Sequence, residues 1–174
     1  MKKLGSSIFN WLKTFAIAII IGLIVNHTLI ASAVIISSSM EGTIMTNSRV
    51  MGLRVAYTFR DPGRFDIILF EPPDGTVSVP FVKRIIGLPY ETVTIVNGEV
   101  FINDASVPLY EPFLAEDMRG SYGPFVVPGD SFFVMGDNRN RSNDSRHWNN
   151  SFVSRDDIIG RLYFEFFPNP QILS

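Results

Sequence analysis

Three short segments of the chain contain residue types that could carry out nucleophilic chemistry. The first is the run Ser37-Ser38-Ser39, which directly follows a long apolar stretch. A serine hydroxyl becomes a nucleophile when a neighbouring base accepts its proton. Small hydroxyl residues at a membrane exit can equally form a solvated junction, so this run alone is weak evidence for catalysis.

The second segment, residues 81–86, could supply the base. Strand alternation places Lys83 on one face and Arg84 on the other, so one cation must lie among apolar neighbours. If that cation is Lys83, burial lowers its pKa and lets it accept a serine proton near neutral pH, whereas an arginine stays protonated. The alternative, a pair of solvated charges protecting an edge strand, is favoured when these residues are taken alone.

The third segment is a dense polar loop at residues 136–146. Loops of this kind on rigid scaffolds often carry function. The loop is not a calcium-binding EF-hand, because Arg139 occupies the third ligand position and Ser142 stands where a glycine is required. A simple turn with an ion pair between Asp144 and Arg146 is the alternative interpretation.

Other catalytic centres find little support in the sequence. A Ser-His-Asp triad would have to recruit His147, with Asp144 or Asp137 as its orienting group, and nothing in the spacing favours this minor alternative. The chain has only two histidines, no cysteine and no evident carboxylate cluster. We therefore expect no metal and no cofactor.

The overall composition limits the class of protein. The chain has 174 residues, of which 46% are hydrophobic and 18% charged, which indicates an ordered protein with a core. Lys and Arg total 15 against 17 Asp and Glu, so the basic field that nucleic-acid backbones require is absent. We expect no nucleic-acid partner.

An apolar stretch at residues 14–36 predicts a membrane anchor. It carries no charge if His27 is neutral, and as a helix of about 1.5 Å per residue it spans roughly 34 Å. Three lysines precede it, Lys2, Lys3 and Lys13. The positive-inside rule then predicts a single-pass membrane protein, with a cytoplasmic tail at residues 1–13, a transmembrane anchor at residues 14–36 and an extracytoplasmic domain at residues 37–174.

A cleaved secretory signal is the alternative to an anchor. Ala31-Ser32-Ala33 has the small-x-small form of a cleavage site. However, the apolar run before Ala31 exceeds the roughly 7 to 15 residues of a signal core, and residues 34–36 continue it past the cut. A retained anchor fits better.

The rest of the chain reads as a mainly β domain, because short alternating apolar stretches are separated by Gly, Pro, Asn and Asp. Asn97-Gly98 between residues 92–96 and 99–102 predicts a hairpin with a type I′ turn. Further predictions are strands at 66–70, 81–86, 131–135 and 161–166, a turn at 128–130 and a long surface excursion at 104–124. We therefore predict an antiparallel β-sheet domain with a β-hairpin extension, preceded by one N-terminal transmembrane helix.

The three segments, in this order after a single anchor, resemble the bacterial type I signal peptidases, or leader peptidases, in their short single-anchor form. SSSMEGTI resembles the serine box of that family, FDIILF the following strand and FVKRIIGLP the lysine box. MGDNRNRSNDSRHW resembles the Gly-Asp-Asn-Arg box, and NGEVFIND and Glu111-Pro112 fit as well. The likeness covers essentially the whole chain.

The resemblance implies a membrane-bound serine endopeptidase that removes signal peptides from secreted preproteins through an acyl-enzyme, cleaving after small residues at −1 and −3. Ser39 would be the nucleophile and Lys83 its general base. The Ser39 backbone N–H and the Ser37 hydroxyl would form the oxyanion hole. Ser142 would orient the Lys83 amine.

The same resemblance implies supporting residues and partners. The residues that brace the loop would be Asp137, Asp144 and Arg146, and those that line the substrate pocket would be Ile36, Ile44 and Val82. The expected location is the bacterial cell membrane, and the expected partners are preprotein signal peptides, the lipid bilayer and the secretion translocon. Family members commonly have proline at the positions of Ile36 and Gly42, and this chain departs from that pattern.

Two other functions remain as alternatives to signal-peptide cleavage. One is a tethered homologue that binds signal sequences without cutting them, against which the set of Ser39, Lys83 and Ser142 argues. The other is a serine–lysine self-cleaving protein on a similar scaffold. Such proteins normally carry a nucleic-acid-binding module, whereas only an apolar helix precedes the serine here.

Overall fold

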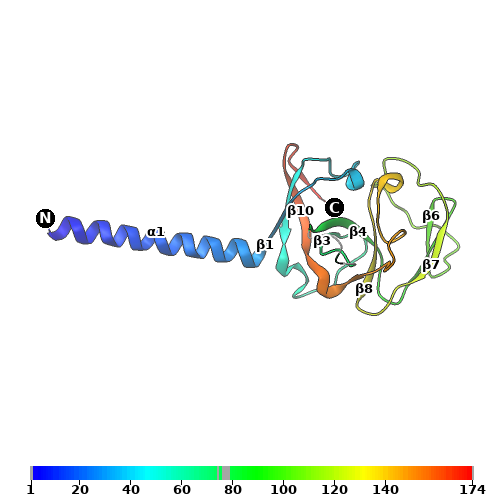
Figure 1. Cartoon of the computed structure of the whole chain (residues 1–174), viewed down its shortest axis with the longest axis horizontal. Helices are drawn as coiled ribbons and strands as arrows, with labels where there is room; N and C mark the ends of the chain where they lie inside the picture. The colour runs from blue at the N-terminus through cyan, green and yellow to red at the C-terminus, as the bar shows by residue number, and fades with distance from the viewer. Residues whose placement is uncertain (1, 74, 76–78, 174) are drawn as a thin grey trace. The chain divides into compact units, whose positions relative to one another are not determined.

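An apolar helix occupies the N-terminal part of the chain in the computed structural model, which describes residues 2–73, 75 and 79–173. The chain divides into two units, one ending at Ile30 and the other beginning at Ala31. Helix α1 runs over Lys2–Leu29 (Figure 1). Its section Asn10–Leu29 is 20 residues long and apolar enough to cross a membrane, and none of that section is buried by protein.

The helix ends before the predicted end of the anchor. Residues Ile30–Val34 form strand β1 instead of continuing the helix to residue 36. The reason is packing, since Ala31 and Ile35 are buried in the core of the second unit. A cut after Ala33 would divide this strand, which favours a retained segment over a cleaved signal.

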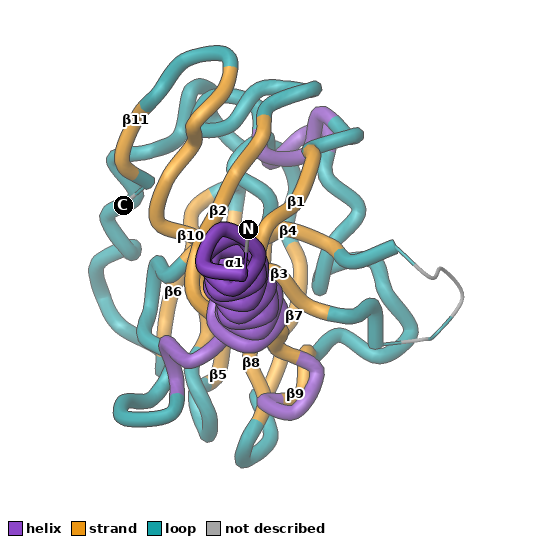
Figure 2. Tube along the Cα trace, turned by 90° about the vertical axis from the view of Figure 1, so that its left-hand side faces the viewer, coloured by secondary structure: helices purple, strands orange, loops and turns teal. Residues whose placement is uncertain are grey.

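The second unit is built around an eight-stranded sheet. Seven strands follow the order β1-β2-β10-β3-β4-β8-β9, and β11 pairs with β10. Figure 2 shows the strands of this unit along the Cα trace. Their bounds are β2 Arg49–Leu53, β3 Ile67–Phe70, β4 Phe81–Gly87, β8 Ser131–Met135, β9 Val153–Ser154, β10 Ile158–Phe167 and β11 Gln171–Ile172. Short 3₁₀ turns lie at η1 Ser38–Met40, η2 Arg54–Tyr57, η3 Arg139–Arg141 and η4 Arg155–Asp157.

The predicted hairpin is confirmed. Strands β5 Thr92–Val96 and β6 Glu99–Ile102 pair antiparallel, with Val96 opposite Glu99. The turn residues Asn97 and Gly98 have φ angles of 50° and 88°, as a type I′ turn requires. Strand β7 Tyr122–Val126 pairs with β5, so the hairpin extension is a three-stranded sheet.

The prediction of a surface excursion at residues 104–124 is partly wrong. Much of this segment is irregular, but Met118 is buried, Leu109 and Phe113 pack against the same core cluster, and β7 begins at Tyr122. Apolar residues without strand or helix periodicity gave no sign of this packing. Strands β1, β2, β7, β9 and β11 were likewise not predicted, because they are short or contain Gly and Pro.

Strand β4 is an interior strand, since it pairs with β3 on one side and β8 on the other. Both faces of β4 are also covered, since Val82 belongs to one core cluster and Ile85 to another. Both cations are therefore buried, with Lys83 4% and Arg84 0% exposed. The edge-strand alternative for these charges is wrong. Two buried cations on one strand must each find partners, and those partners define the site described next.

Candidate active site

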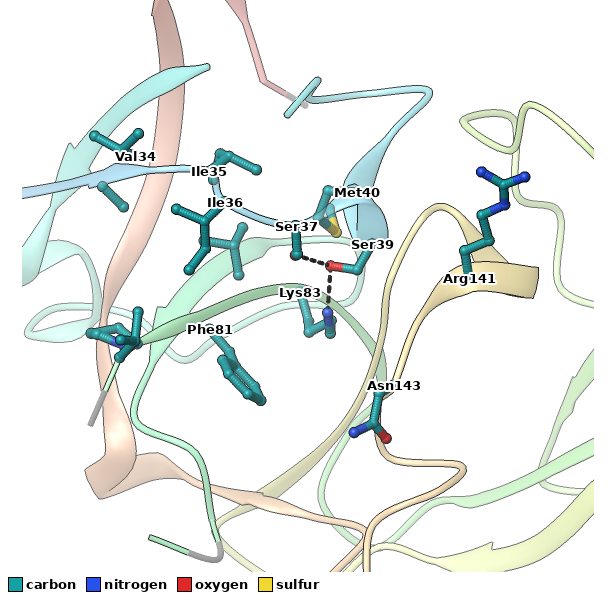
Figure 3. A pocket seen from close by; sticks show the side chains of 14 residues that line it. Val34, Ile35, Ile36, Ser37, Ser39, Met40, Phe81, Lys83, Arg141 and Asn143 are labelled. Atoms are coloured by element: carbon teal, nitrogen blue, oxygen red, sulfur yellow. Dashed lines mark hydrogen bonds between the residues drawn. The ribbon is translucent and has the colours of Figure 1, made fainter. Parts of the chain in front are cut away.

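The turn η1 brings the serine run to the lysine of β4. Lys83 Nζ donates a hydrogen bond of 2.6 Å to Ser39 Oγ, and Ser39 is only 7% exposed. Ser37 Oγ lies 3.2 Å from Ser39 Oγ (Figure 3). Two of the three clustered serine hydroxyls and the buried amine thus meet at one point, although 44 residues separate Ser39 from Lys83.

The environment of Lys83 changes its acidity. Burial is the largest cause and lowers the pKa of Lys83 from 10.5 to about 8. The charge of Asp144 opposes this shift, that of Arg146 adds to it, and that of Asp137 opposes it. A substantial fraction of this amine is therefore unprotonated in mildly alkaline solution.

The second cation of β4 holds the start of the polar loop. Arg84 Nε and Nη2 donate to Asp137 Oδ1 and Oδ2 at 2.9 and 2.8 Å, a two-bond ion pair with both side chains fully buried. The guanidinium of Arg84 also lies 3.9 Å from the ring centroid of Phe113. Thr43 Oγ1 donates to Asp137 at 2.6 Å, which joins the segment after the serine run to the loop.

A second buried ion pair lies farther along the same loop. Arg146 Nε and Nη2 donate to the two oxygens of Asp144 at 2.8 and 2.9 Å, and the backbone N–H of Gly136 donates to Asp144 at 3.0 Å. Burial opposes ionisation of Asp144, but the hydrogen bonds and charge of Arg146 outweigh it and hold the pKa of this carboxyl below its usual value. Asp137, Asp144 and Arg146 thus all take part in buried ion pairs of the loop.

The loop touches the serine turn through its backbone. Asn138 N donates to Ser39 O at 3.0 Å, and Asn138 Nδ2 donates to Ser38 O at 3.0 Å. Gly136 permits this close approach, because a Cβ there would lie 2.3 Å from Ser39 O and 2.4 Å from Ser142 Oγ. The position of Ser39 thus depends on the loop.

The predicted hydrogen bond between Ser142 and Lys83 is not among the interactions of the described residues. Ser142 is buried, but the Lys83 amine is directed at Ser39 instead. His147 Nδ1 lies 3.9 Å from Asp144 Oδ1, and no hydrogen bond joins this histidine to a serine in the part of the chain that the structure describes. The triad alternative therefore has no geometric support.

An apolar pocket of about 310 Å³ adjoins the serine–lysine pair. Ile36 and Val82 line it, as expected. Ile44 does not, because it is fully buried in the core with Met40 and Val82, so it can influence the pocket only through these neighbours. The other lining residues are Ala33, Val34, Ile35, Ser37, Ser39, Met40, Val79, Pro80, Phe81, Lys83, Arg141 and Asn143.

Several residues at the site were not predicted. Thr43 and Asn138 contact the loop and the serine turn, and Arg139 pairs with Glu111 through bonds of 2.8 and 2.6 Å. The only sequence signal for the last pair was the fit of Glu111-Pro112 to the family pattern. Among the described residues, no group of three or more His, Cys, Asp or Glu side chains could hold a metal ion.

A buried serine that accepts a hydrogen bond from a lysine of lowered pKa is the arrangement of serine hydrolases that work without a histidine. Comparison with known proteins agrees. Residues 8–167 match the family described as "Signal peptidase, peptidase S26". The chain belongs to this family, whose members include serine endopeptidases that remove signal peptides, and it has that activity.

Curated relatives align over nearly the whole chain. A probable signal peptidase I-2 from Synechocystis sp. is 37% identical, covering 94% of this chain and 76% of that protein. Signal peptidase I P from Bacillus subtilis subsp. natto is also 37% identical, covering 95% and 92%. A crystal structure of a signal peptidase I from Enterococcus faecalis V583 is 34% identical, has a TM-score of 0.50 and covers 59% of this chain and 97% of that chain.

Proposed function

We propose that Ser39 and Lys83 form the catalytic dyad with which this chain cleaves signal peptides. The observation that carries the proposal is the 2.6 Å contact between Lys83 Nζ and Ser39 Oγ, beside an apolar pocket. A lysine with a pKa of about 8 can be neutral at little cost near physiological pH, as a general base must be.

When Lys83 is neutral, the Ser39 hydroxyl donates the hydrogen bond to Lys83 Nζ. Acylation begins when Lys83 accepts this proton. Ser39 Oγ then attacks the scissile carbonyl carbon and forms a tetrahedral oxyanion. The Ser39 backbone N–H and the Ser37 hydroxyl donate to that oxyanion. The Lys83 ammonium next protonates the leaving amine, the C–N bond breaks, and the signal peptide remains as an ester on Ser39.

Deacylation repeats the steps with water. Lys83, neutral again, accepts a proton from the water molecule that attacks the ester carbonyl. The second tetrahedral intermediate then collapses, the ammonium returns its proton to Ser39 Oγ, and the signal peptide leaves as a carboxylic acid, which loses its remaining proton to the solvent. In both halves of the reaction, Lys83 accepts the proton of the attacking group and passes it to the leaving group.

The pocket supports cleavage after small residues at −1 and −3. Strand β1 is at the edge of its sheet, and residues 33–36 line the pocket, so an extended peptide can pair with this edge. Side chains of an extended peptide alternate in direction, so those at −1 and −3 lie on the same side of the peptide. In the proposed complex that side faces Ile36, Phe81 and Val82. The apolar lining suits the uncharged side chains of an Ala-x-Ala site, and the preference for small residues follows from the family to which the chain belongs.

The membrane arrangement is part of the same proposal. The N-terminus is cytoplasmic, α1 crosses the cell membrane once, and the domain from residue 37 onward faces the outside, as the lysines before the apolar helix favour. In this arrangement the bilayer and emerging signal peptides are direct partners. The secretion translocon is a partner because it delivers the preprotein.

The experiment incubates purified, detergent-solubilised protein with a model preprotein whose signal ends in Ala-x-Ala, and locates the cut by mass spectrometry. We expect cleavage after the last Ala by the wild type and by Ser38→Ala, a matched control that removes a neighbouring hydroxyl. Ser39→Ala, Lys83→Ala and Lys83→Arg should not cleave. Full activity in any of these three variants would overturn the proposed dyad.

A further inference from the structure

A second cleft adjoins the apolar pocket. Its volume is about 510 Å³, and Arg141 and Asn143 line both hollows, so the two share a wall. The remaining residues of the second cleft are Arg119, Tyr122, Arg139, Asn140, Ser142 and His147. Whereas the first hollow is mainly apolar, the second is lined by three arginines and no carboxylate.

Two of the three arginines keep their charge available. Arg139 is buried and neutralised by its two-bond pair with Glu111. Arg119 and Arg141 are exposed, and neither guanidinium has an ion pair in the described part of the chain. The nearest acidic segment keeps its side chains outside the cleft lining, with the Glu116 carboxylate accepting a hydrogen bond from Asn140.

Asn140 fixes Arg119 next to the loop that carries Arg141. Its Oδ1 accepts from the backbone N–H of Arg119, and its Nδ2 donates to Asp117 O and to Glu116, all at 3.0 Å. These bonds connect the segment that precedes β7 to the polar loop at residues 136–146. Asn140 therefore keeps Arg119 close to Arg141, and both arginines line the second cleft.

The position of the second cleft relative to the dyad indicates which part of the substrate it would contact. In Figure 3, Val34, Ile36 and Phe81 lie on one side of the Ser39–Lys83 pair, and Arg141 and Asn143 lie on the other. If residues −1 and −3 occupy the apolar side, the chain beyond the scissile bond leaves over Arg141 and Asn143. That path leads into the second cleft.

We infer that this cleft binds the first residues of the mature polypeptide and favours carboxylate side chains there, through Arg119 and Arg141. This inference rests on the proposed dyad and on the proposed direction of the substrate. Its ligand is an acidic peptide segment directly after the cut. The enzyme would thereby select for charge on the mature side of the scissile bond, in addition to selecting for size on the signal side.

The test uses three preproteins with the same Ala-x-Ala site that differ only at the second to fourth mature residues, where they carry Glu, Gln or Lys. For the wild type at about 50 mM salt we expect kcat/KM to fall in the order Glu, Gln, Lys, with about tenfold between the ends. At about 500 mM salt the ratio should drop below about threefold, because exposed charges are screened.

Variants assign the effect to the cleft. In Arg119→Gln/Arg141→Gln the Glu-to-Lys ratio should fall to about one, and in Arg119→Glu/Arg141→Glu it should invert. Arg49→Gln is the matched control, since it removes an exposed arginine on β2 and should keep the wild-type ratio. Thermal unfolding of each variant checks that these exposed substitutions leave the fold intact.

The outcomes separate this inference from the function on which it rests. Equal cleavage of the three substrates by the wild type, or a ratio unchanged by charge reversal at both arginines, would overturn the acidic preference and leave the dyad standing. Failure of the wild type to cleave any of the three would overturn both.

Discussion

Lys83 is the residue on which the proposed chemistry depends. Burial makes its protonated form unfavourable, and two carboxylates, Asp144 and Asp137, limit the shift. Each of these carboxylates also has its own buried arginine partner. Because the charges are largely paired with one another, desolvation of Lys83 remains the main influence on its pKa.

The first prediction concerns pH. Only the neutral form of Lys83 can accept a proton from Ser39, and the neutral fraction rises with pH through a pKa of about 8. We expect kcat/KM to rise about tenfold per pH unit below pH 7 and to level off above about pH 8 to 9. Steady-state cleavage of the model preprotein between pH 5.5 and pH 10 measures this.

The same profile discriminates against other bases. A midpoint near the ordinary histidine value of about 6.5 would contradict the assignment and implicate a histidine. In Asp144→Asn the opposing negative charge is lost, so the midpoint of the residual activity should move to lower pH. A merely structural role for Asp144 would lower activity without moving the midpoint.

The second prediction concerns stability. The folded-state pKa of Lys83 lies below its unfolded value of 10.5, so burying the charge is unfavourable at all pH values below about 8. This penalty disappears as pH rises from about 8 to 10.5, because the folded protein has then already released the proton. Lys83→Met should therefore stabilise the protein at pH 7 by about 1–3 kcal/mol while abolishing cleavage.

Thermal unfolding in detergent at pH 7 and pH 10 checks this second prediction. The melting temperature of Lys83→Met should exceed that of the wild type by several degrees at pH 7, and the difference should shrink at pH 10. A variant that is less stable at pH 7, or equally stabilised at both pH values, would contradict the burial argument.

The residues with chemical roles could be proposed from the sequence because local pattern and family resemblance converge on Ser39, Lys83 and the polar loop. The ion-pair partners of Arg84 and Arg139 could not be proposed. Alternation in β4 separates Lys83 from Arg84 but does not reveal that both faces of the strand are covered, which depends on the core clusters that contain Val82 and Ile85. The pairing of Arg139 with Glu111 likewise depends on tertiary contact between distant segments.

At the scale of elements, the polar loop at residues 136–146 positions the serine turn. Two buried ion pairs hold its ends, and Asn138 bonds the backbone of the turn directly. The close approach at Gly136 leaves no room for a side chain. The loop therefore supports the conformation of the serine turn through backbone contacts, in addition to supplying side chains to the site.

The third prediction follows from this contact. In Gly136→Ala the added Cβ would lie 2.3 Å from Ser39 O, so the turn or the loop must shift. A displacement of about 1 Å at the nucleophile should lower kcat by about 10²-fold. Cleavage kinetics of the variant measure the loss.

The control is Gly63→Ala, where the nearest atom to the new Cβ is Asp66 Oδ2 at an ordinary 3.8 Å. This variant should keep nearly full activity. Wild-type kcat in Gly136→Ala would show that the loop does not set the position of Ser39.

The elements themselves were predictable in unequal measure. The hairpin β5–β6 has a strong local signal in Asn97-Gly98, and the apolar interior strands β3, β4 and β8 follow from their composition. Strand β1 could not be predicted because Ile30 to Val34 continue the apolar run of the anchor. Only the burial of Ala31, which the sequence does not reveal, distinguishes this strand from the helix before it. Strand β7 was hidden because Gly123 and Pro124 ordinarily interrupt strands.

At the scale of the whole molecule, the apolar helix and the sheet domain have different surroundings. The side chains of Asn10–Leu29 are exposed and most of them are apolar, which a lipid environment accommodates. The other unit has its own core around the sheet. Strand β1 and residues 35–38 separate the helix from Ser39, so the nucleophile lies farther along the chain from the helix than the predicted anchor implied.

The fourth prediction tests the membrane topology. The chain has no cysteine, so single cysteines can be introduced without background. A membrane-impermeant maleimide should label Asp104→Cys in intact cells but not Ser6→Cys, because only the former lies outside. Both should be labelled after permeabilisation. The reverse pattern in intact cells would contradict the proposed orientation.

The central claim is that Ser39 and Lys83 act as one unit, and a double-mutant comparison tests it most directly. The measurement is kcat/KM of Ser39→Ala, Lys83→Ala and the double variant on the Ala-x-Ala preprotein. Because either change disables the same step, we predict that all three lose activity equally, by about 10³-fold or more. Losses that multiply in the double variant, or substantial activity in either single variant, would contradict the dyad.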